Sequence, residues 1–523
     1  MEQQINALFE LLASPDIEAS VEQRREAAFT AHVLMHSWEH VNPATAADIS
    51  AALTRLSSTD CPYRGALIES MLYRITGKET HLKQLSDHLR RYQPDISAGM
   101  ATFNAVAAFH FNASSGEHER LKQHLGRQVQ KQLFETLLAR AETLFDLVKE
   151  QIPVQQATCN NRVVILTKQF IKPPHAPSAD ALSFAARLIK HHGKQVIILS
   201  TSELANVYDG AVAPCTQFNV QPELLGTNTL SFDGVDIPFS MLSTGEFTEQ
   251  TMAKGLATIA SYDPETIISV GAPSLLAEPF ASTRFCFIYQ TGRGIPLTRH
   301  CYFHTWDAPD QEMNELVQAE ELTDQYLFVQ HPGFDLKPPS TALTREQFGI
   351  DADAFVFVIV GMRLHSDVTP GFLGMLEHVL ENERVHFAFA GHFERYDEIL
   401  AKHPDLAKHS THLGFQNDIM AVYNLSDAFI NPTRKGGGGG IVYAMQAGLP
   451  VLTLPYGDAG MAASQFPQLS SYEEMASKAI ELIETPETMQ QYQKLAEREG
   501  IRFSNRDSFT DRIVEAFEKH CAG

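Results

Sequence analysis

Apolar residues recur every three or four positions through about the first 150 residues of the chain, which predicts helices. Ile5, Leu8 and Leu12 share one helical face, and breakers such as Pro43 and Gly77 separate successive segments. No cluster of catalytic residue types stands in this region. We therefore expect residues 1–150 to form an all-helical domain that serves recognition or interaction.

After this region, short apolar runs alternate with amphipathic stretches, which predicts β-α-β units and a parallel sheet. The predicted strands of a first unit lie at 162–166, 195–199, 263–271 and 284–289. A loop at 171–178, which carries His175 and Ser178, lies at the carboxyl end of the first of these strands. A second unit is predicted to contain strands at 355–360 and 385–390. We expect two Rossmann-like domains, 151–335 and 336–523, facing a cleft.

The stretch from Asp427 to Pro455 is predicted to form a strand, a glycine loop, a helix and a buried strand. The predicted helix spans 441–447, and its loop contains Arg434, Lys435 and the five glycines Gly436, Gly437, Gly438, Gly439 and Gly440. A glycine loop that opens a helix leaves several N–H groups unpaired, and the helix dipole adds positive potential there. The pattern therefore predicts a diphosphate site. A flexible glycine linker is the alternative reading.

Composition excludes several classes of protein. The chain is 44% hydrophobic and 20% charged, which is typical of a globular protein. Its net charge of −22 makes nucleic acid and anionic membrane surfaces poor partners. The six cysteines form no CxxC pair, which argues against a disulfide framework or a cysteine zinc site. No signal peptide or membrane segment is evident, so we expect a cytoplasmic protein.

From residue 332 onward, five motifs occur in the order found in a known family. They are Pro332-Gly333-Phe334-Asp335, Gly361-Met362-Arg363-Leu364, Gly391, Leu413-Gly414 and the run from Tyr443 to Val451. This order resembles the nucleotide-sugar domain of GT-B glycosyltransferases, especially the retaining families that carry a glutamate pair. The resemblance implies a GT-B fold and a nucleotide diphosphate sugar donor, with a UDP-sugar as the first choice.

The family motifs and the basic glycine loop together give a set of candidate donor-binding residues. They are Arg363, Gly391, Gly414, Arg434, Lys435, the glycines 436–440 and Tyr443. Three positions depart from the family pattern: Lys435 and Tyr443 stand where the family has its two glutamates, and Asp367 stands near a position that is usually basic. We expect Lys435 to supply the missing positive charge, while the departures put a retaining outcome in doubt.

A helical domain fused to GT-B is also similar to the soluble bacterial adhesin N-glycosyltransferases and the O-GlcNAc transferase group, which are inverting and use protein acceptors. An inverting reaction needs a base near the acceptor. His175, His300 and His304 are the candidates by position, with Asp180 as a further one. No Asp-x-Asp cluster stands at a strand end, so we expect no metal and no cofactor besides the donor.

The predicted function is transfer of a sugar from a nucleotide diphosphate donor to an acceptor, with a protein or a glycan as the candidate acceptor. Two alternatives stay open. A catalytically inactive GT-B subunit that binds and stabilises a partner is favoured by the absence of the glutamate pair and opposed by the basic glycine loop. A sugar-nucleotide 2-epimerase shares the fold but leaves the helical domain unexplained.

Overall fold

The chain divides into two compact units in a computed structural model. It describes residues 2–113, 115–154, 160–172, 175–204, 208–214, 220–335, 338–381 and 384–522. The first unit comprises Met1–Gln330 with Arg512–Gly523, and the second comprises His331–Asp511. The first unit therefore joins the predicted helical region and the first predicted sheet.

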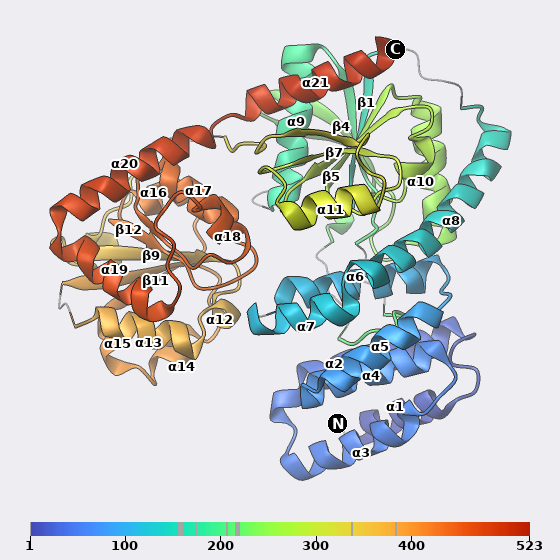
Figure 1. The fold of residues 1–523 in the computed structure, drawn as a ribbon, viewed down its shortest axis with the longest axis horizontal. Coiled ribbons are helices and arrows are strands. Elements are labelled where there is room, and N and C mark those ends of the chain that lie inside the picture. Colours follow the sequence, from blue (N-terminus) through green and yellow to red (C-terminus); the bar gives the residue numbers. More distant parts are fainter. Residues whose placement is uncertain are drawn as a thin grey trace. The chain divides into compact units, whose positions relative to one another are not determined.

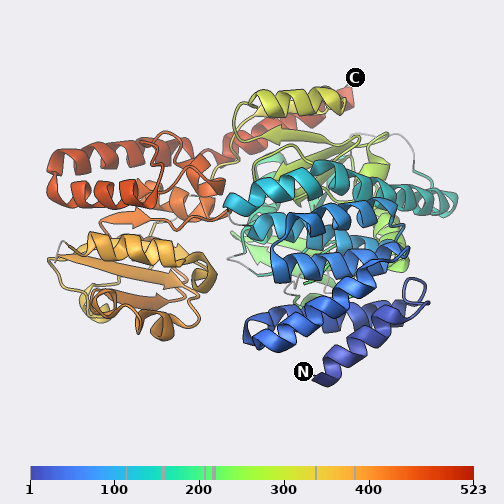
Figure 2. The same cartoon turned by 60° about the horizontal axis from the view of Figure 1, so that its bottom comes forward.

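The first part of the first unit is helical, as predicted. Its helices are α1 (Glu2–Ala13), α2 (Val21–His36), α3 (Pro43–Ser57), α4 (Pro62–Thr76), α5 (Glu79–Arg91), α6 (Ile96–Asn112), α7 (Ser115–Leu125) and α8 (Arg127–Gln151), which Figures 1 and 2 show in blue to cyan. The predicted breakers act as caps: the Asn42 side chain accepts from the amide of Thr45, and Gly77 ends α4 with φ 65°. No helix in the described ranges has the length and apolar character to cross a bilayer.

The first sheet has eight strands in the order β3-β4-β2-β1-β5-β6-β7-β8. Their bounds are β1 (Arg162–Thr167), β2 (Gln195–Ser200), β3 (Gly226–Phe232), β4 (Val235–Met241), β5 (Thr266–Gly271), β6 (Phe285–Gln290), β7 (Tyr302–Thr305) and β8 (Tyr326–Val329). All neighbours are parallel except β3 and β4, which pair antiparallel. The helices that follow the strands are α9 (Ala176–His192), α10 (Glu249–Tyr262) and α11 (Gln311–Ala319).

The sequence analysis missed the β3–β4 hairpin, although the chain contains a signal for it. Asp233 and Gly234 form a two-residue turn with φ 50° and 71°, and Phe232 pairs with Val235 across it. Asp-Gly between alternating polar and apolar residues is the usual sequence of such a turn. The signal was hidden because the surrounding β3 residues are only half-buried and mostly polar.

The helical region contributes directly to the core of the first sheet. Leu137 and Leu138 of α8 belong to the same buried cluster as Val164 and Leu166 of β1. Arg127, at the start of α8, donates to the carbonyls of Ile295 and Pro296. α8 also packs against α10, and the two helices lie next to each other in Figure 1. The region at 1–150 is therefore built into the first unit, and its last long helix serves as part of the layer that covers the sheet.

The second unit is built on a five-stranded parallel sheet with the order β11-β10-β9-β12-β13. Its strands are β9 (Phe355–Gly361), β10 (Val385–Gly391), β11 (Ser410–Gly414), β12 (Ala428–Ile430) and β13 (Val451–Leu452). Its helices are α12 (Leu364–Asp367), α13 (Pro370–Val379), α14 (Tyr396–Leu400), α15 (Pro404–Lys408), α16 (Ile419–Tyr423), α17 (Gly438–Gln446), α18 (Gly457–Ala462), α19 (Tyr472–Glu484) and α20 (Pro486–Arg502). A last helix, α21 (Arg506–Ala522), begins in the second unit and ends in the first. The helical region followed by two doubly wound sheets confirms the predicted fold class.

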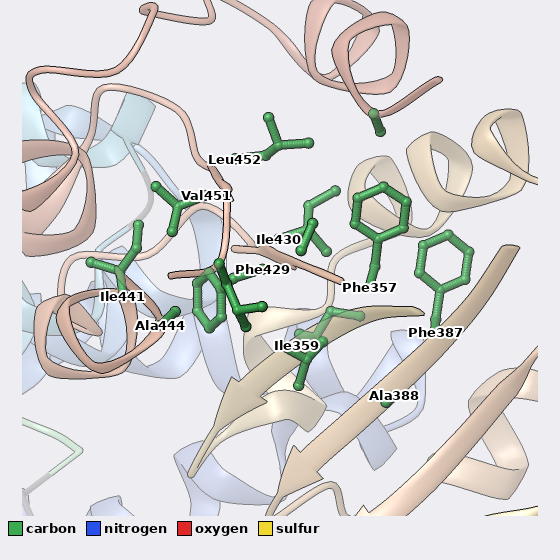
Figure 3. Close-up of a cluster of buried hydrophobic side chains, with 14 of the residues drawn as sticks. Phe357, Ile359, Phe387, Ala388, Phe429, Ile430, Ile441, Ala444, Val451 and Leu452 are labelled. Carbon is green, nitrogen blue, oxygen red and sulfur yellow. The ribbon is translucent and has the colours of Figure 1, made fainter. Parts of the chain in front are cut away.

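Apolar residues of α17 anchor the glycine stretch to the second sheet. Ile441 and Ala444 point toward Phe429 of β12 and Val451 of β13, as Figure 3 shows. All four side chains are at most 2% exposed. This packing fixes the helix and therefore the place where its amino end lies.

We predict that removing Leu138 of α8 destabilises the first unit, whereas the same change at Leu147 of that helix does not. Leu138 is 0% exposed and Leu147 is 51% exposed. Leu138→Ala should lower the free energy of unfolding by about 2–5 kcal/mol, because it leaves a cavity beneath the sheet. Leu147→Ala should change it by no more than about 0.5 kcal/mol. Urea unfolding measures both, and equal effects would contradict the shared core.

Candidate functional site

The carboxyl edge of the second sheet has one point at which the chain's connections run in opposite directions. The chain leaves β9 for β10 on one side, while β12 pairs with β9 on the other side. In open parallel sheets, ligands bind in the crevice outside such a point. Arg363 follows β9, and Arg434 and Lys435 follow β12. The structure therefore places these three predicted residues at the carboxyl ends of the two strands that flank this point.

The glycine stretch is part of a helix rather than a loop that precedes one. The helix was predicted to begin at Ile441, but α17 begins at Gly438, so that the last three of the five glycines form its first turn. Gly437 precedes it with φ 97°, and no side chain caps the helix. The amides of Gly438, Gly439 and Gly440 are thus at the open amino end of a helix. This arrangement rules out the flexible-linker reading.

Close packing explains why glycine stands at two of these positions. A Cβ added to Gly437 would lie 2.6 Å from Nε of Arg434, and its φ also favours glycine. A Cβ added to Gly438 would lie 3.0 Å from Cβ of Asp458. The phenol of Tyr423 donates to the carbonyl of Gly440 over 2.7 Å. Contacts with Arg434, Asp458 and Tyr423 thus fix the first turn of α17 against the rest of the protein.

The guanidinium group of Arg434 joins the segments that follow β9 and β12. Nη2 donates to the carbonyl of Val360 over 2.6 Å and to Oδ1 of Asn431 over 2.8 Å, and Nη1 pairs with Oδ2 of Asp367 at 3.0 Å. The side chain is only 8% exposed, and that of Asp367 is 10% exposed. Nε is buried without a hydrogen-bond partner among the described residues, beside Gly437. Asp367, which departs from the family pattern, therefore serves as the counter-charge of Arg434.

Asp458, which the sequence analysis did not identify, lies beside Lys435. Its amide donates to the carbonyl of Lys435 over 2.7 Å, and Gly457 leaves room for that approach. Burial raises the pKa of Asp458 to about 6, and the nearby Lys435 opposes this rise. Burial lowers the pKa of Lys435, and Asp458 opposes that change. No local pattern pointed to Asp458, because a short strand and a tight turn bring it to the loop.

Gly391 and Gly414 lie at the ends of neighbouring strands β10 and β11, where backbone conformation requires glycine. Gly391 has φ 123°, and a Cβ there would lie 1.9 Å from the carbonyl oxygen of Gly361. Gly414 has φ 66°. Tyr443 packs edge-on against Phe334 with ring centroids 5.5 Å apart. Gly391 and Gly414 thus lie at the carboxyl edge of the sheet, whereas Tyr443 lies in the second turn of α17.

An aromatic pair that was not predicted stands at the same edge. The rings of His392 and Phe415 follow β10 and β11 and stack with centroids 5.5 Å apart and an interplanar angle of 14°. Phe415 is 38% exposed, and Met362, which follows β9, is 53% exposed. Exposed apolar groups at a ligand crevice can receive the flat face of a base. The sequence feature that could have indicated this pair is Phe415, which directly follows the predicted Leu413-Gly414 motif.

The three histidines predicted as catalytic belong to the first unit and differ in burial. His304 lies in β7 and is 0% exposed; its Nε2 accepts from the amide of Gln290. Burial lowers its pKa to about 4. His300 is exposed, and its amide donates to Glu278 over 3.0 Å. His175 stands at the N-cap position of α9 and is partly exposed, whereas Pro173 and Pro174 of its loop lie outside the described residues.

The described part of the chain contains no group of three or more His, Cys, Asp or Glu side chains that could hold a metal ion. Independence from metal stays a prediction.

Residues 354–485 match the family model described as "Glycosyl transferases group 1", and this segment lies within the second unit. No curated protein matches the sequence.

Several solved structures resemble this chain. A mutant O-GlcNAc transferase of Thermobaculum terrenum is 13% identical with a TM-score of 0.45, over 99% of this chain and 97% of that one. A glycosyltransferase of Rickettsia africae is 13% identical with a TM-score of 0.48, over 69% and 98%. Anabaena HepE in complex with UDP is 16% identical with a TM-score of 0.45, over 68% and 100%.

We predict that Arg434→Ala strongly destabilises the second unit. The change leaves the carboxylate of Asp367 buried without its counter-charge, which typically costs about 3–5 kcal/mol. Lys408→Ala is the control, since its pair with Asp405 is exposed by 71% and 83% and such pairs contribute about 0–1 kcal/mol. Urea unfolding of both variants measures the difference. A small loss at Arg434 would refute the network as the support of the crevice.

We also predict a pH effect from Asp458. Its pKa is raised from 3.8 to about 6 in the folded protein, so the folded state binds this proton more readily than the unfolded state. Stability should therefore fall as pH rises between about pH 4 and about pH 6. Asp458→Asn should remove this part of the decline and stabilise the protein at neutral pH, by on the order of 2–3 kcal/mol. Unfolding free energies across that range test this, with Asp405→Asn as the exposed control, and an unchanged pH profile would contradict it.

Proposed function

We propose that this chain, a glycosyltransferase by its group 1 domain and a GT-B protein by its order of elements, transfers a sugar from a nucleoside diphosphate donor to an acceptor. The observation that carries the proposal is the set of groups at the carboxyl edge where β9 and β12 pair. The open amino end of α17, Arg363, Lys435 and the unpaired Nε of Arg434 all lie around it, within the segment that matches the family.

The chemistry of the reaction explains why these groups suit it. When the sugar leaves a nucleoside diphosphate, negative charge develops on the diphosphate, and groups that stabilise this charge lower the barrier. Three helix amides offer directed donors, and Arg363 and Lys435 offer positive charge. Because burial already disfavours the charge of Lys435, an anion beside it would relieve that penalty.

Asp458 gives this crevice a carboxylate that the missing glutamate pair would otherwise supply. The family resemblance places Lys435 and Tyr443 at the two glutamate positions, and neither can act as an anionic acceptor for sugar hydroxyls. Asp458 lies beside Lys435 and can accept such hydrogen bonds when ionised. We infer that it contacts the donor sugar.

The base of the donor is proposed to lie near the ring pair of His392 and Phe415. This pair stands at the carboxyl ends of β10 and β11, away from the glycine turn that takes the diphosphate. A UDP-sugar is the first donor to test, and a free diphosphate nucleotide is the simplest probe.

For the acceptor we propose a protein. The net charge of −22 disfavours work at an anionic membrane surface. The first unit also carries an open groove of about 730 Å³, lined by Val21 and Phe29 of α2 together with Tyr208. Val21 is 44% exposed and Phe29 is 48% exposed, and apolar side chains on a surface suit a polypeptide.

We predict that UDP raises the melting temperature of the protein and that Lys435→Ala and Arg363→Ala reduce this shift. A ligand at 100 times its Kd stabilises the folded state by about 2.7 kcal/mol. Losing one charge-assisted hydrogen bond costs about 1.5–3 kcal/mol, which weakens binding by roughly tenfold to a hundredfold. Lys402→Ala, at an exposed position of the same unit, is the control.

The outcomes separate the candidate functions. Absence of a shift with UDP, GDP, ADP and CMP would overturn donor binding at the glycine turn. Binding without turnover of any nucleotide sugar would favour an inactive subunit. Conversion of UDP-GlcNAc to its epimer without an acceptor would favour an epimerase instead of a transferase.

A further inference from the structure

Ser178 and His175 are joined by a hydrogen bond at the start of α9. The Ser178 hydroxyl lies 2.8 Å from Nδ1 of His175 and accepts a hydrogen bond from the amide of Ile171 over 3.0 Å. Ser178 is 0% exposed. Among the described residues, the hydroxyl has these two partners and no others.

These two hydrogen bonds determine where the proton of the Ser178 hydroxyl points. The amide of Ile171 can only donate, so the hydroxyl accepts there and must place its own proton elsewhere. A buried hydroxyl proton without an acceptor is unfavourable, and Nδ1 of His175 is the acceptor within reach. Nδ1 therefore accepts a hydrogen bond from the Ser178 hydroxyl through its lone pair and carries no proton itself. A neutral imidazole with an unprotonated Nδ1 carries its own proton on Nε2.

The ring is held neutral and its second nitrogen is available. Burial lowers the pKa of His175, which keeps the ring uncharged at neutral pH. Nε2 makes no hydrogen bond within the part of the chain that the structure describes. The residue is partly exposed, so a ligand can reach it.

His175 lies at a point of the first sheet that is typical of ligand crevices. The chain passes from β1 to β2 on one side, and β5 pairs with β1 on the other. His175 follows β1 and stands at the N-cap position of α9, without a side-chain capping hydrogen bond. Pro177 lies against Gly271, the last residue of β5. A Cβ added to Gly271 would be 3.4 Å from the Cβ of Pro177. The histidine thus stands at the carboxyl edge where connections diverge.

We propose that Ser178 is a positioning residue that fixes the ring proton of His175 on Nε2, so that His175 donates a hydrogen bond to a substrate oxygen and does not act as a general base. The part about substrate rests on the proposed glycosyl transfer, whereas the tautomer does not. Hydroxyl and phosphate oxygens are the acceptors that suit such a donor. This role differs from the base expected of His175 in an inverting reaction.

Nitrogen NMR of the histidine-labelled full-length protein tests the tautomer without any ligand. Correlations between ring nitrogens and ring carbon-bound protons distinguish which nitrogen is protonated, and His175→Gln assigns the signal. We expect a neutral ring with its proton on Nε2. A proton on Nδ1 would overturn the proposal. Ser178→Ala should populate the other tautomer, while Ser183→Ala, which removes a buried hydroxyl from the same helix, should leave the signal unchanged. An unchanged tautomer in a folded Ser178→Ala variant would refute the positioning role.

Turnover of a UDP-sugar tests the role of the donated hydrogen bond. Glutamine keeps an N–H donor but cannot take up a proton, whereas alanine keeps neither function. We expect His175→Gln to retain kcat/KM within about threefold and His175→Ala to lose about tenfold, the value of one hydrogen bond. An equal, large loss in both variants would indicate a base and overturn the donor role. If no UDP-sugar is turned over, the proposed function fails, while the NMR result still decides the tautomer.

Discussion

The guanidinium group of Arg434 is the interaction on which the candidate site depends. It joins the end of β9, the end of β12 and the short helix α12 through Val360, Asn431 and Asp367. β9 and β12 already pair as strands, and the guanidinium adds α12 to the ends of both. The glycines begin two residues after Arg434, so their position depends on the same contacts. A buried charge that is hydrogen-bonded on several sides can fix a conformation in this way, at a cost in desolvation.

The same residue shows why sequence patterns identify a site more readily than they assign roles within it. Arg434 and Lys435 are adjacent and carry the same charge, so nothing in the sequence distinguishes them. In the structure the guanidinium turns into the protein, whereas Lys435 lies beside Asp458. Asp367 looked like a defect in a family pattern, and it is the partner of Arg434. The pairing of Arg434 with Asp367 joins residues 67 positions apart, so no local pattern in the sequence shows it.

Much of the fold could be predicted because its signals are local. Strand β12 has the predicted bounds, and β1, β2, β9 and β10 extend only one residue beyond theirs. The buried strands are continuous apolar runs, which is the pattern that identifies parallel strands in a sequence. The start of α17 was placed three residues late, because glycine is a poor helix former and its presence argued for a loop. Packing of Ile441 and Ala444 against the sheet overrides that preference. That the N-terminal helices bury apolar surface on the rest of the protein was anticipated, but not that α8 covers the first sheet, since an amphipathic helix does not reveal which surface it covers.

The three glycines in the first turn of α17 have a consequence for how a ligand would bind. Glycine loses more backbone entropy than any other residue when it becomes helical, by about 1 kcal/mol per position relative to alanine. The turn is therefore the part of this helix that opens most readily, and its amides should exchange with solvent faster than those after Ile441. An anion that accepts from these amides would supply the partners that the helix end lacks. A bound anion would therefore order the first turn of α17. Part of the binding free energy would offset the conformational entropy that the glycines lose.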